Sequence, residues 1–200
     1  MQQPAKINYR IYQGGTFQEI YRWESQTKVY VPISAISKTA PCVITTATAT
    51  QLPVGWRFRV TGVQGMKEIN TTSEDQWYIA TSILGNNQIT INSVNSTGYT
   101  AYTSGGTLEY NDWVSLANLT ARMQIRETVD SATVIHQSTT QNGEIAIDQT
   151  YKTITINIPA SVTETFTFET AVYSVELVDT AGVVTPFLTG NLVLVREVTR

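Results

Sequence analysis

Residues 154–158 read Ile-Thr-Ile-Asn-Ile, a run in which every second side chain is apolar. Alternation with a period of two places apolar side chains on one face of a β-strand and polar side chains on the other. Similar runs recur along the chain, with turn-forming residues between them. They cover residues 7–12, 17–23, 28–31, 119–126, 133–137, 145–147, 172–178 and 188–195. The sequence therefore predicts an all-β protein.

The composition agrees with this fold class. The chain has 200 residues, of which 32 are threonine, a β-branched residue that suits strands better than helices. Charged residues make up 14% of the chain, against about 25% in an average soluble domain. The net charge of −3 lacks the strong basic excess of a nucleic-acid-binding domain, so we expect no nucleic-acid partner.

Cysteine and histidine each occur once, as Cys42 and His136. These counts exclude a disulfide framework within the chain, a cysteine-rich zinc site and a multi-histidine metal site. The first ten residues lack the apolar core of a secretory signal, and no apolar run approaches the ~18 residues that span a membrane. We expect no cofactor, no metal, no membrane association and synthesis in a reducing compartment.

Local signals indicate how the strands connect. Asn142-Gly143 predicts a β-hairpin, because both residues tolerate a positive φ. Ala181-Gly182 predicts the turn that joins the last two long strands. Residues 161–170 give the best helical window, but four threonines in it favour a loop or a single turn over a regular helix.

The middle of the chain differs from its flanks. Residues 37–110 are denser in Gly, Asn and Thr, and their predicted strands are shorter. This stretch also has its own large apolar residues, including Trp56, Phe58 and Trp77. We predict a small β-barrel at 37–110, inserted into one inter-strand loop of an immunoglobulin-like antiparallel β-sandwich made of residues 1–36 and 111–200.

The middle segment resembles the FCCH-like β-barrel, a module named after the first catalytic-cysteine half-domain of ubiquitin-activating enzymes and used repeatedly in phage tail proteins. The matching stretches are 41–46, 52–66, 69–70, 77–79 and 95–107. The last of these, Asn95 to Thr107, is the most specific. Thr50-Gln51-Leu52 departs from the His-Gly-Leu often found at that position.

The flanks resemble a different module, the immunoglobulin-like sandwich at the N-termini of baseplate upper proteins and tail fibres. The matching stretches are 12–17, Trp23, 118–126, 142–145, 154–160 and 173–179. The resemblance implies a virion component made in the bacterial cytoplasm and located in the tail or baseplate region. It also implies a non-enzymatic adaptor or fibre-attachment subunit that contacts tail hub, baseplate or fibre proteins and forms a symmetric ring or trimer.

Three alternatives remain open: a capsid decoration protein, a glycan-binding host-attachment module, and a polysaccharide-degrading enzyme with paired carboxylates. The candidate carboxylates for the enzyme are Glu74 with Asp75, Glu164 with Glu169, and Glu176 with Asp179. The thiol of Cys42 and the imidazole of His136 are better explained as strand residues than as catalytic groups, because neither has an evident partner in the sequence. No catalytic residue is therefore assigned.

The candidate site is a protein interface. Tyr and Trp are favoured at interfaces and on glycan-stacking surfaces, although such residues also fill cores. Arg122 and Arg126 share the same strand parity, so we expect them on one face. The segment before Ile7 is a candidate arm for adding a strand to a partner. The candidate interface residues are Tyr99, Tyr102, Trp113, Arg122 and Arg126.

Overall fold

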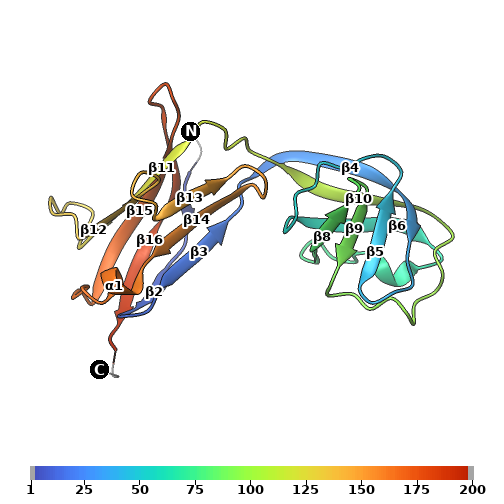
Figure 1. The fold of residues 1–200 in the computed structure, drawn as a ribbon, viewed down its shortest axis with the longest axis horizontal. Helices are drawn as coiled ribbons and strands as arrows, with labels where there is room; N and C mark the ends of the chain where they lie inside the picture. Colours follow the sequence, from blue (N-terminus) through green and yellow to red (C-terminus); the bar gives the residue numbers. More distant parts are fainter. Residues whose placement is uncertain (1–2, 198–200) are drawn as a thin grey trace. The chain divides into compact units, whose positions relative to one another are not determined.

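A computed structural model describes residues 3–197, and the prediction of an all-β fold is confirmed. The chain forms two compact units (Figure 1). The first unit contains residues 1–21 and 115–200, and the second contains residues 22–114.

These boundaries differ from the predicted ones at 36/37 and 110/111. Strand β4 (Glu24–Ile36) pairs with β10 (Ser104–Trp113) from Glu24↔Trp113 to Pro32↔Thr107. Both ends of the predicted insertion therefore extend further into the chain, and residues 28–31 belong to the second unit. Alternation identifies a strand, but it carries no information about which sheet the strand joins.

The larger sheet of the first unit has β16 (Val184–Val195) near one side and β12 (His136–Thr139) at the other. Between them lie β15 (Thr170–Val178) and β11 (Thr120–Arg126), all in antiparallel pairing. Two short strands, β1 (Ala5–Lys6) and β2 (Tyr9–Tyr12), run parallel to β16. The segment proposed as a free arm is thus already paired from Ala5 onward, while residues 1 and 2 lie outside the described residues.

Close backbone approach brings the N-terminal segment onto β16. The amide of Ile7 donates to the carbonyl of Thr189 at 2.9 Å. A Cβ atom on the neighbouring Gly190 would lie 1.7 Å from the carbonyl oxygen of Ile7, so only glycine fits there.

The second sheet of this unit has the order β13-β14-β3. These strands are β13 (Ile145–Asp148), β14 (Thr153–Ile158) and β3 (Phe17–Tyr21), and a single helical turn, α1 (Ala160–Thr163), follows β14. The apolar residues on the inward side of the alternating runs are buried, among them Ile154, Ile156 and Ile158 from this sheet and Met123, Ile125 and Val175 from the larger one. The unit is thus sandwich-like, and alternation accounts for its core.

The two predicted turns have different outcomes. Ala181-Gly182 does connect β15 to β16, and the side chain of Asp179 accepts hydrogen bonds from the amides of Ala181 and Val183. Asn142-Gly143 does not close a hairpin, because β12 pairs with β11 and β13 pairs with β14 in the other sheet. The prediction of a hairpin there was wrong. Gly143 has a φ of +79° as expected, but the turn crosses between sheets.

The side chain of Asn142 instead covers the open edge of β12. Its Oδ1 accepts from the amide of Thr139 at 2.9 Å, and its Nδ2 donates to the carbonyl of Gln137 at 3.0 Å. These are the two groups that a neighbouring strand would otherwise use. A side-chain amide therefore takes the place of one residue of an additional strand.

The second unit is built from one seven-stranded sheet of order β7-β6-β10-β4-β5-β9-β8. The remaining strands are β5 (Cys42–Thr46), β6 (Arg57–Gln64), β7 (Tyr78–Ile79), β8 (Ser82–Leu84) and β9 (Gln88–Ile91), and a 3-10 turn, η1, spans Lys67–Ile69. The two end strands, β7 and β8, are consecutive in the chain. One short stretch therefore supplies both ends of the sheet, which forms a half-barrel around a buried core that includes Trp56, Phe58 and Ile44.

Candidate protein interface

The structure places the five candidate interface residues in both units. Arg122 and Arg126 lie on β11 of the first unit. Tyr99, Tyr102 and Trp113 belong to the second unit. The five residues therefore form two separate groups, one in each unit.

Arg122 and Arg126 face the same side of β11, with Gln124 between them, as strand parity predicts; Ala121, Met123 and Ile125 on the other side are buried. Arg122 lies opposite Glu176 of β15, and its Nε donates to Glu176 Oε2 at 2.7 Å. The two side chains are 50% and 33% exposed. A pair this exposed contributes about 0–1 kcal/mol to stability, so it leaves Arg122 available to a partner.

Arg126 is tied more firmly to its surroundings. Its Nη1 donates to the carbonyls of Ser131 at 2.5 Å and Ala132 at 3.0 Å, in the loop that leads to β12. Its Nη2 donates to Gln124 Oε1 at 2.8 Å, and Gln124 Nε2 donates in turn to Gln137 Oε1 at 2.9 Å. Arg126 therefore orients the β11–β12 loop, and none of these acceptors is a carboxylate that neutralises it.

Two further cations lie on the same face of the larger sheet. Lys6 is paired with Thr189 and Arg10 is paired with Val193, and paired residues share a face. The outward strand positions of this face thus carry four cations and one carboxylate, Glu176, in a chain whose net charge is −3. Val193 and Tyr12, which lie 43% and 61% exposed, add apolar surface to it. We call this surface the cationic face.

The aromatic candidates of the second unit pack against its own core. The hydroxyl of Tyr102 lies 2.9 Å from the carbonyl oxygen of Gly105 and 3.1 Å from that of Ile33. The ring of Trp113 meets that of Trp56 edge-on at 6.5 Å. Tyr99 is half-buried beside the same core. These contacts give all three residues a structural role within the unit.

Cys42 and His136 are both held in structural contacts. Cys42 is fully buried in the core of the second unit, and burial raises the pKa of its thiol, which opposes thiolate formation. His136 Nε2 lies 2.6 Å from Glu144 Oε2, and its ring packs beside Phe166 at 5.8 Å. This pair connects the larger sheet to the segment that enters β13. Among residues 3–197, no group of three or more His, Cys, Asp or Glu side chains could hold a metal ion.

The acidic pairs that the sequence suggested do not form a shared carboxylate site. Glu176 bonds to Arg122, and Asp179 caps the β15–β16 turn. Glu164, Glu169, Glu74 and Asp75 are exposed.

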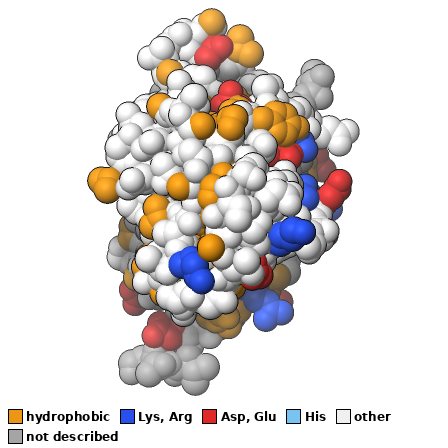
Figure 2. Space-filling model, turned by 90° about the vertical axis from the view of Figure 1, so that its right-hand side faces the viewer, with side chains coloured by type: hydrophobic (Ala, Val, Ile, Leu, Met, Phe, Trp, Pro, Cys, Tyr) orange, Lys and Arg blue, Asp and Glu red, His pale blue; other side chains and the backbone are white. Residues whose placement is uncertain are grey.

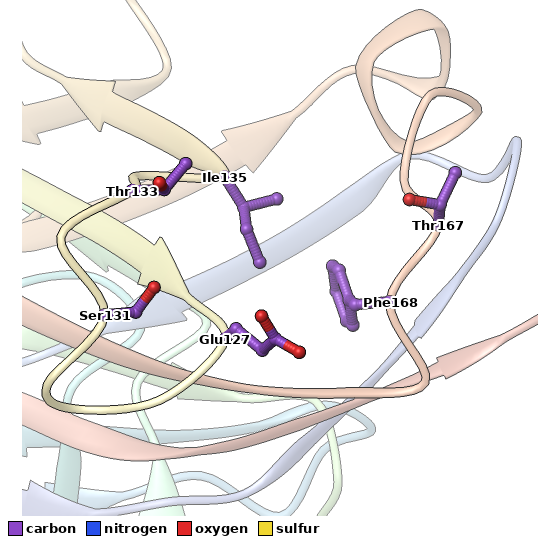
Figure 3. Close-up of a pocket in the computed structure, with 6 residues that line it drawn as sticks. All are labelled: Glu127, Ser131, Thr133, Ile135, Thr167 and Phe168. Atoms are coloured by element: carbon purple, nitrogen blue, oxygen red, sulfur yellow. The ribbon is translucent and has the colours of Figure 1, made fainter.

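A shallow pocket of about 310 Å³ lies between the β11–β12 loop and the segment before β15. In Figure 3 the carboxylate of Glu127 faces the side chains of Ile135 and Phe168 across this space, while Ser131, Thr133 and Thr167 supply hydroxyls at its margin. One carboxylate beside apolar groups cannot divide acid and base roles as paired carboxylates do. Such a pocket suits the insertion of a single side chain.

The second unit contains a polar cluster that the sequence reasoning missed. The carboxylate of Glu24 accepts two hydrogen bonds from Arg57, one from Nε at 2.6 Å and one from Nη2 at 2.7 Å. It also accepts a hydrogen bond from Asn111 Nδ2 at 3.0 Å. The guanidinium of Arg57 stacks on Trp77 at 4.4 Å from the ring centre. The sequence signal that could have indicated this cluster was the shared strand parity of Arg57 and Arg59, which places both side chains on one face of β6. The face seen in Figure 2 is mostly uncharged, with a few Lys, Arg, Asp and Glu side chains spread over it.

Comparisons with known proteins leave the chain without a family assignment: no family model matches it, and no match is found among curated proteins. No helix within residues 3–197 is long and apolar enough to cross a membrane.

Proposed function

We propose that this chain is a non-enzymatic structural subunit of a tailed bacteriophage particle, an adaptor or fibre-attachment protein of the tail or baseplate that acts through protein–protein interfaces. The observation that carries the proposal is the cationic face. Four cations with one carboxylate on an otherwise acidic chain fit a neighbour with an acidic surface, because complementary charge orients and accelerates docking.

The resemblance of residues 95–107 and of the flanking strands to phage tail modules supports the same proposal. The sandwich-like first unit, which the second unit interrupts between β3 and β11, agrees with an inserted module. We further propose that the first unit is an immunoglobulin-like sandwich and that the second unit is an FCCH-like barrel.

Cross-linking of lysines in intact particles of the parent phage, followed by mass spectrometry, tests this proposal. Lys6 reports on the cationic face, whereas Lys28 and Lys67 report on the second unit. We expect Lys6 to cross-link to a tail hub, baseplate or fibre protein. Cross-links to the major capsid protein alone would contradict the proposal and favour a capsid decoration protein.

A charge reversal sharpens the test. Arg10→Glu should lower the incorporation of the protein into particles, because Arg10 is exposed and lies on the cationic face. Lys67→Glu is the matched control, since it reverses an exposed charge in the second unit. Equal incorporation of both variants would argue against docking through the cationic face.

The glycan-binding alternative gains less support from the geometry. Tyr102 and Trp113, two aromatic residues on which this alternative depends, pack against the core of the second unit rather than forming an open platform. A saccharide array probed with the full chain distinguishes this alternative, because saturable binding of a defined glycan would favour it.

A further inference from the structure

Strand β3 occupies one edge of the smaller sheet. The sheet order β13-β14-β3 gives β3 a single neighbour, β14, and β3 is the outer strand in Figure 1. A strand edge presents a row of backbone amides and carbonyls that another chain can bind. Which groups β3 presents follows from the register of the sheet.

The bond from the amide of Asn157 to the carbonyl of Glu144, at 2.7 Å, shows which residues of β14 bond to β13 and which bond to β3. Antiparallel pairing alternates residues that bond to one neighbour with residues that bond to the other. Because Asn157 bonds towards β13, Ile156 bonds towards β3, where it pairs with Glu19. Phe17 and Tyr21 also face β14. The amides and carbonyls of Gln18 and Ile20 therefore point away from the sheet.

These four groups differ from those at the edge of β12. At β12 the side-chain amide of Asn142 hydrogen-bonds to the outward carbonyl of Gln137 and to the outward amide of Thr139. At β3, no hydrogen bond found within residues 3–197 uses the outward groups of Gln18 or Ile20. Ile20 is also 53% exposed, although it is one of the large apolar residues of its strand. The edge of β3 is thus open.

Glu19 determines which chains can bind this edge. Its side chain lies on the half-buried side of β3 and makes no ion pair within the described residues. If two copies paired through β3 so that all four outward groups bonded, Gln18 would face Ile20 and Glu19 would face Glu19. Like charges directly opposite are destabilising, so a second copy is disfavoured. A cation in that position would be favoured instead.

We propose that the open edge of β3 accepts an extended segment of another protein, in antiparallel pairing, with Lys or Arg opposite Glu19 and an apolar residue opposite Ile20. Backbone bonds to Gln18 and Ile20 supply affinity, and the two side-chain matches supply selectivity. The inference concerns the chemistry of the partner segment, and it holds independently of whether the chain belongs to a phage particle.

The test uses the full chain and the peptide acetyl-Ser-Thr-Val-Lys-Thr-Val-Ser-amide, which places Val opposite Ile20 and Lys opposite Glu19. Binding is followed by nuclear magnetic resonance titration, with amide hydrogen exchange as a second readout. We expect saturable shifts and slower exchange at Gln18 and Ile20. A peptide with Glu in place of Lys should bind roughly five- to tenfold more weakly, because an attraction becomes a repulsion.

Two protein variants separate the proposed mode from adventitious binding. Glu19→Lys should reverse the preference between the two peptides, whereas Glu169→Lys, at an exposed position elsewhere in the first unit, should leave it unchanged. Gln18→Pro removes an outward donor without removing a bond to β14, and it should abolish binding of both peptides. Thermal melts establish that each variant is folded.

Several results would overturn the proposal. These are no binding of the Lys peptide at millimolar concentration, equal binding of both peptides, or protection at β12 in place of β3. Sedimentation supplies an independent check: Glu19→Gln removes the like-charge contact and should raise self-association above that of the wild type. Equal or greater self-association of the wild type would also contradict the proposed role of Glu19.

Discussion

The two units protect the edges of their sheets in different ways. In the second unit, consecutive strands β7 and β8 form both ends of the sheet, and the side-chain amide of Asn70 bonds to the amide and carbonyl of Val63 where β7 no longer covers β6. The first unit has open sheets, and there Asn142 covers β12 while β3 stays open. The second unit thus protects its edges through the path of the chain together with Asn70, whereas the first unit relies at β12 on Asn142.

The largest expected effect lies in the core of the second unit. Trp56 is fully buried, and its Nε1 donates to the carbonyl of Asn111 at 2.8 Å. Trp56→Ala should lower the free energy of unfolding of the second unit by about 3–5 kcal/mol, because it leaves a cavity and an unpaired carbonyl. Calorimetry should show a lower transition temperature for this unit. An unchanged transition would show that the wall of the unit, and not its core, determines its stability.

The pH dependence of stability should also differ between the two units, and this is the second largest expected effect. Burial raises the pKa of Tyr173, whose hydroxyl donates to the carbonyl of Ile7 at 2.9 Å. Burial likewise raises the pKa of Tyr21, which hydrogen-bonds to Tyr9. Because the folded state holds these protons more tightly than the unfolded state, their stabilisation is complete below pH 10 and is lost as the pH rises above it.

For a phenol as buried as that of Tyr173, the loss is about 1.4 kcal/mol per pH unit above 10. Burial also raises the pKa of Tyr78 and Tyr110 in the second unit, but the upward shifts of Tyr21 and Tyr173 in the first unit are larger. Denaturant unfolding at pH 9 to 11.5 should therefore show a steeper loss for the first unit. A Tyr173→Phe variant should show a smaller pH dependence, and an equal slope in this variant would contradict the assignment.

A smaller effect is expected at the covered edge. Asn142→Ala removes the bonds to Gln137 and Thr139 and should cost about 1–2 kcal/mol. Its more informative consequence is faster aggregation, because β12 then presents a bare edge. Light scattering under mildly destabilising conditions measures the rate, and Gln141→Ala is the control at the neighbouring exposed position. Equal rates for the two variants would show that Asn142 does not protect the edge.

The smallest effect concerns the cationic face. A double-mutant cycle on Arg122→Gln and Glu176→Gln should give a coupling energy of about 0–1 kcal/mol, because both side chains are solvent-accessible. Urea unfolding measures the four stabilities. A coupling well above this range would mean that Arg122 is committed to the fold and less available to a partner.

Local patterns predicted individual strands better than their pairing. The alternation at 154–158 and 17–23 correctly located β14 and β3, although β3 ends at Tyr21, and Ala181-Gly182 correctly predicted the turn between the last two strands. The same alternation in β4 could not reveal that the strand pairs with β10 far along the chain. At Asn142-Gly143 the turn chemistry was recognised, but its destination depends on which sheet receives the next strand.

The candidate site was predictable to a similar extent. Strand parity alone places Arg122 and Arg126 on one face, and the structure agrees. The addition of Lys6 and Arg10 to that face depends on parallel pairing with β16, which no local pattern encodes. For Tyr102 and Trp113, aromatic character suits an interface and a core equally well, so only the packed structure could distinguish these roles.

The interrupted first unit also has a consequence for the order of synthesis. Strands β1, β2 and β3 are translated before the second unit, yet their partners β14 and β16 come after it in the chain. All strands of the second unit pair within residues 22–114, so that unit can fold while the earliest strands still wait. Strands β1, β2 and β3 therefore cannot pair until β14 and β16 have been translated.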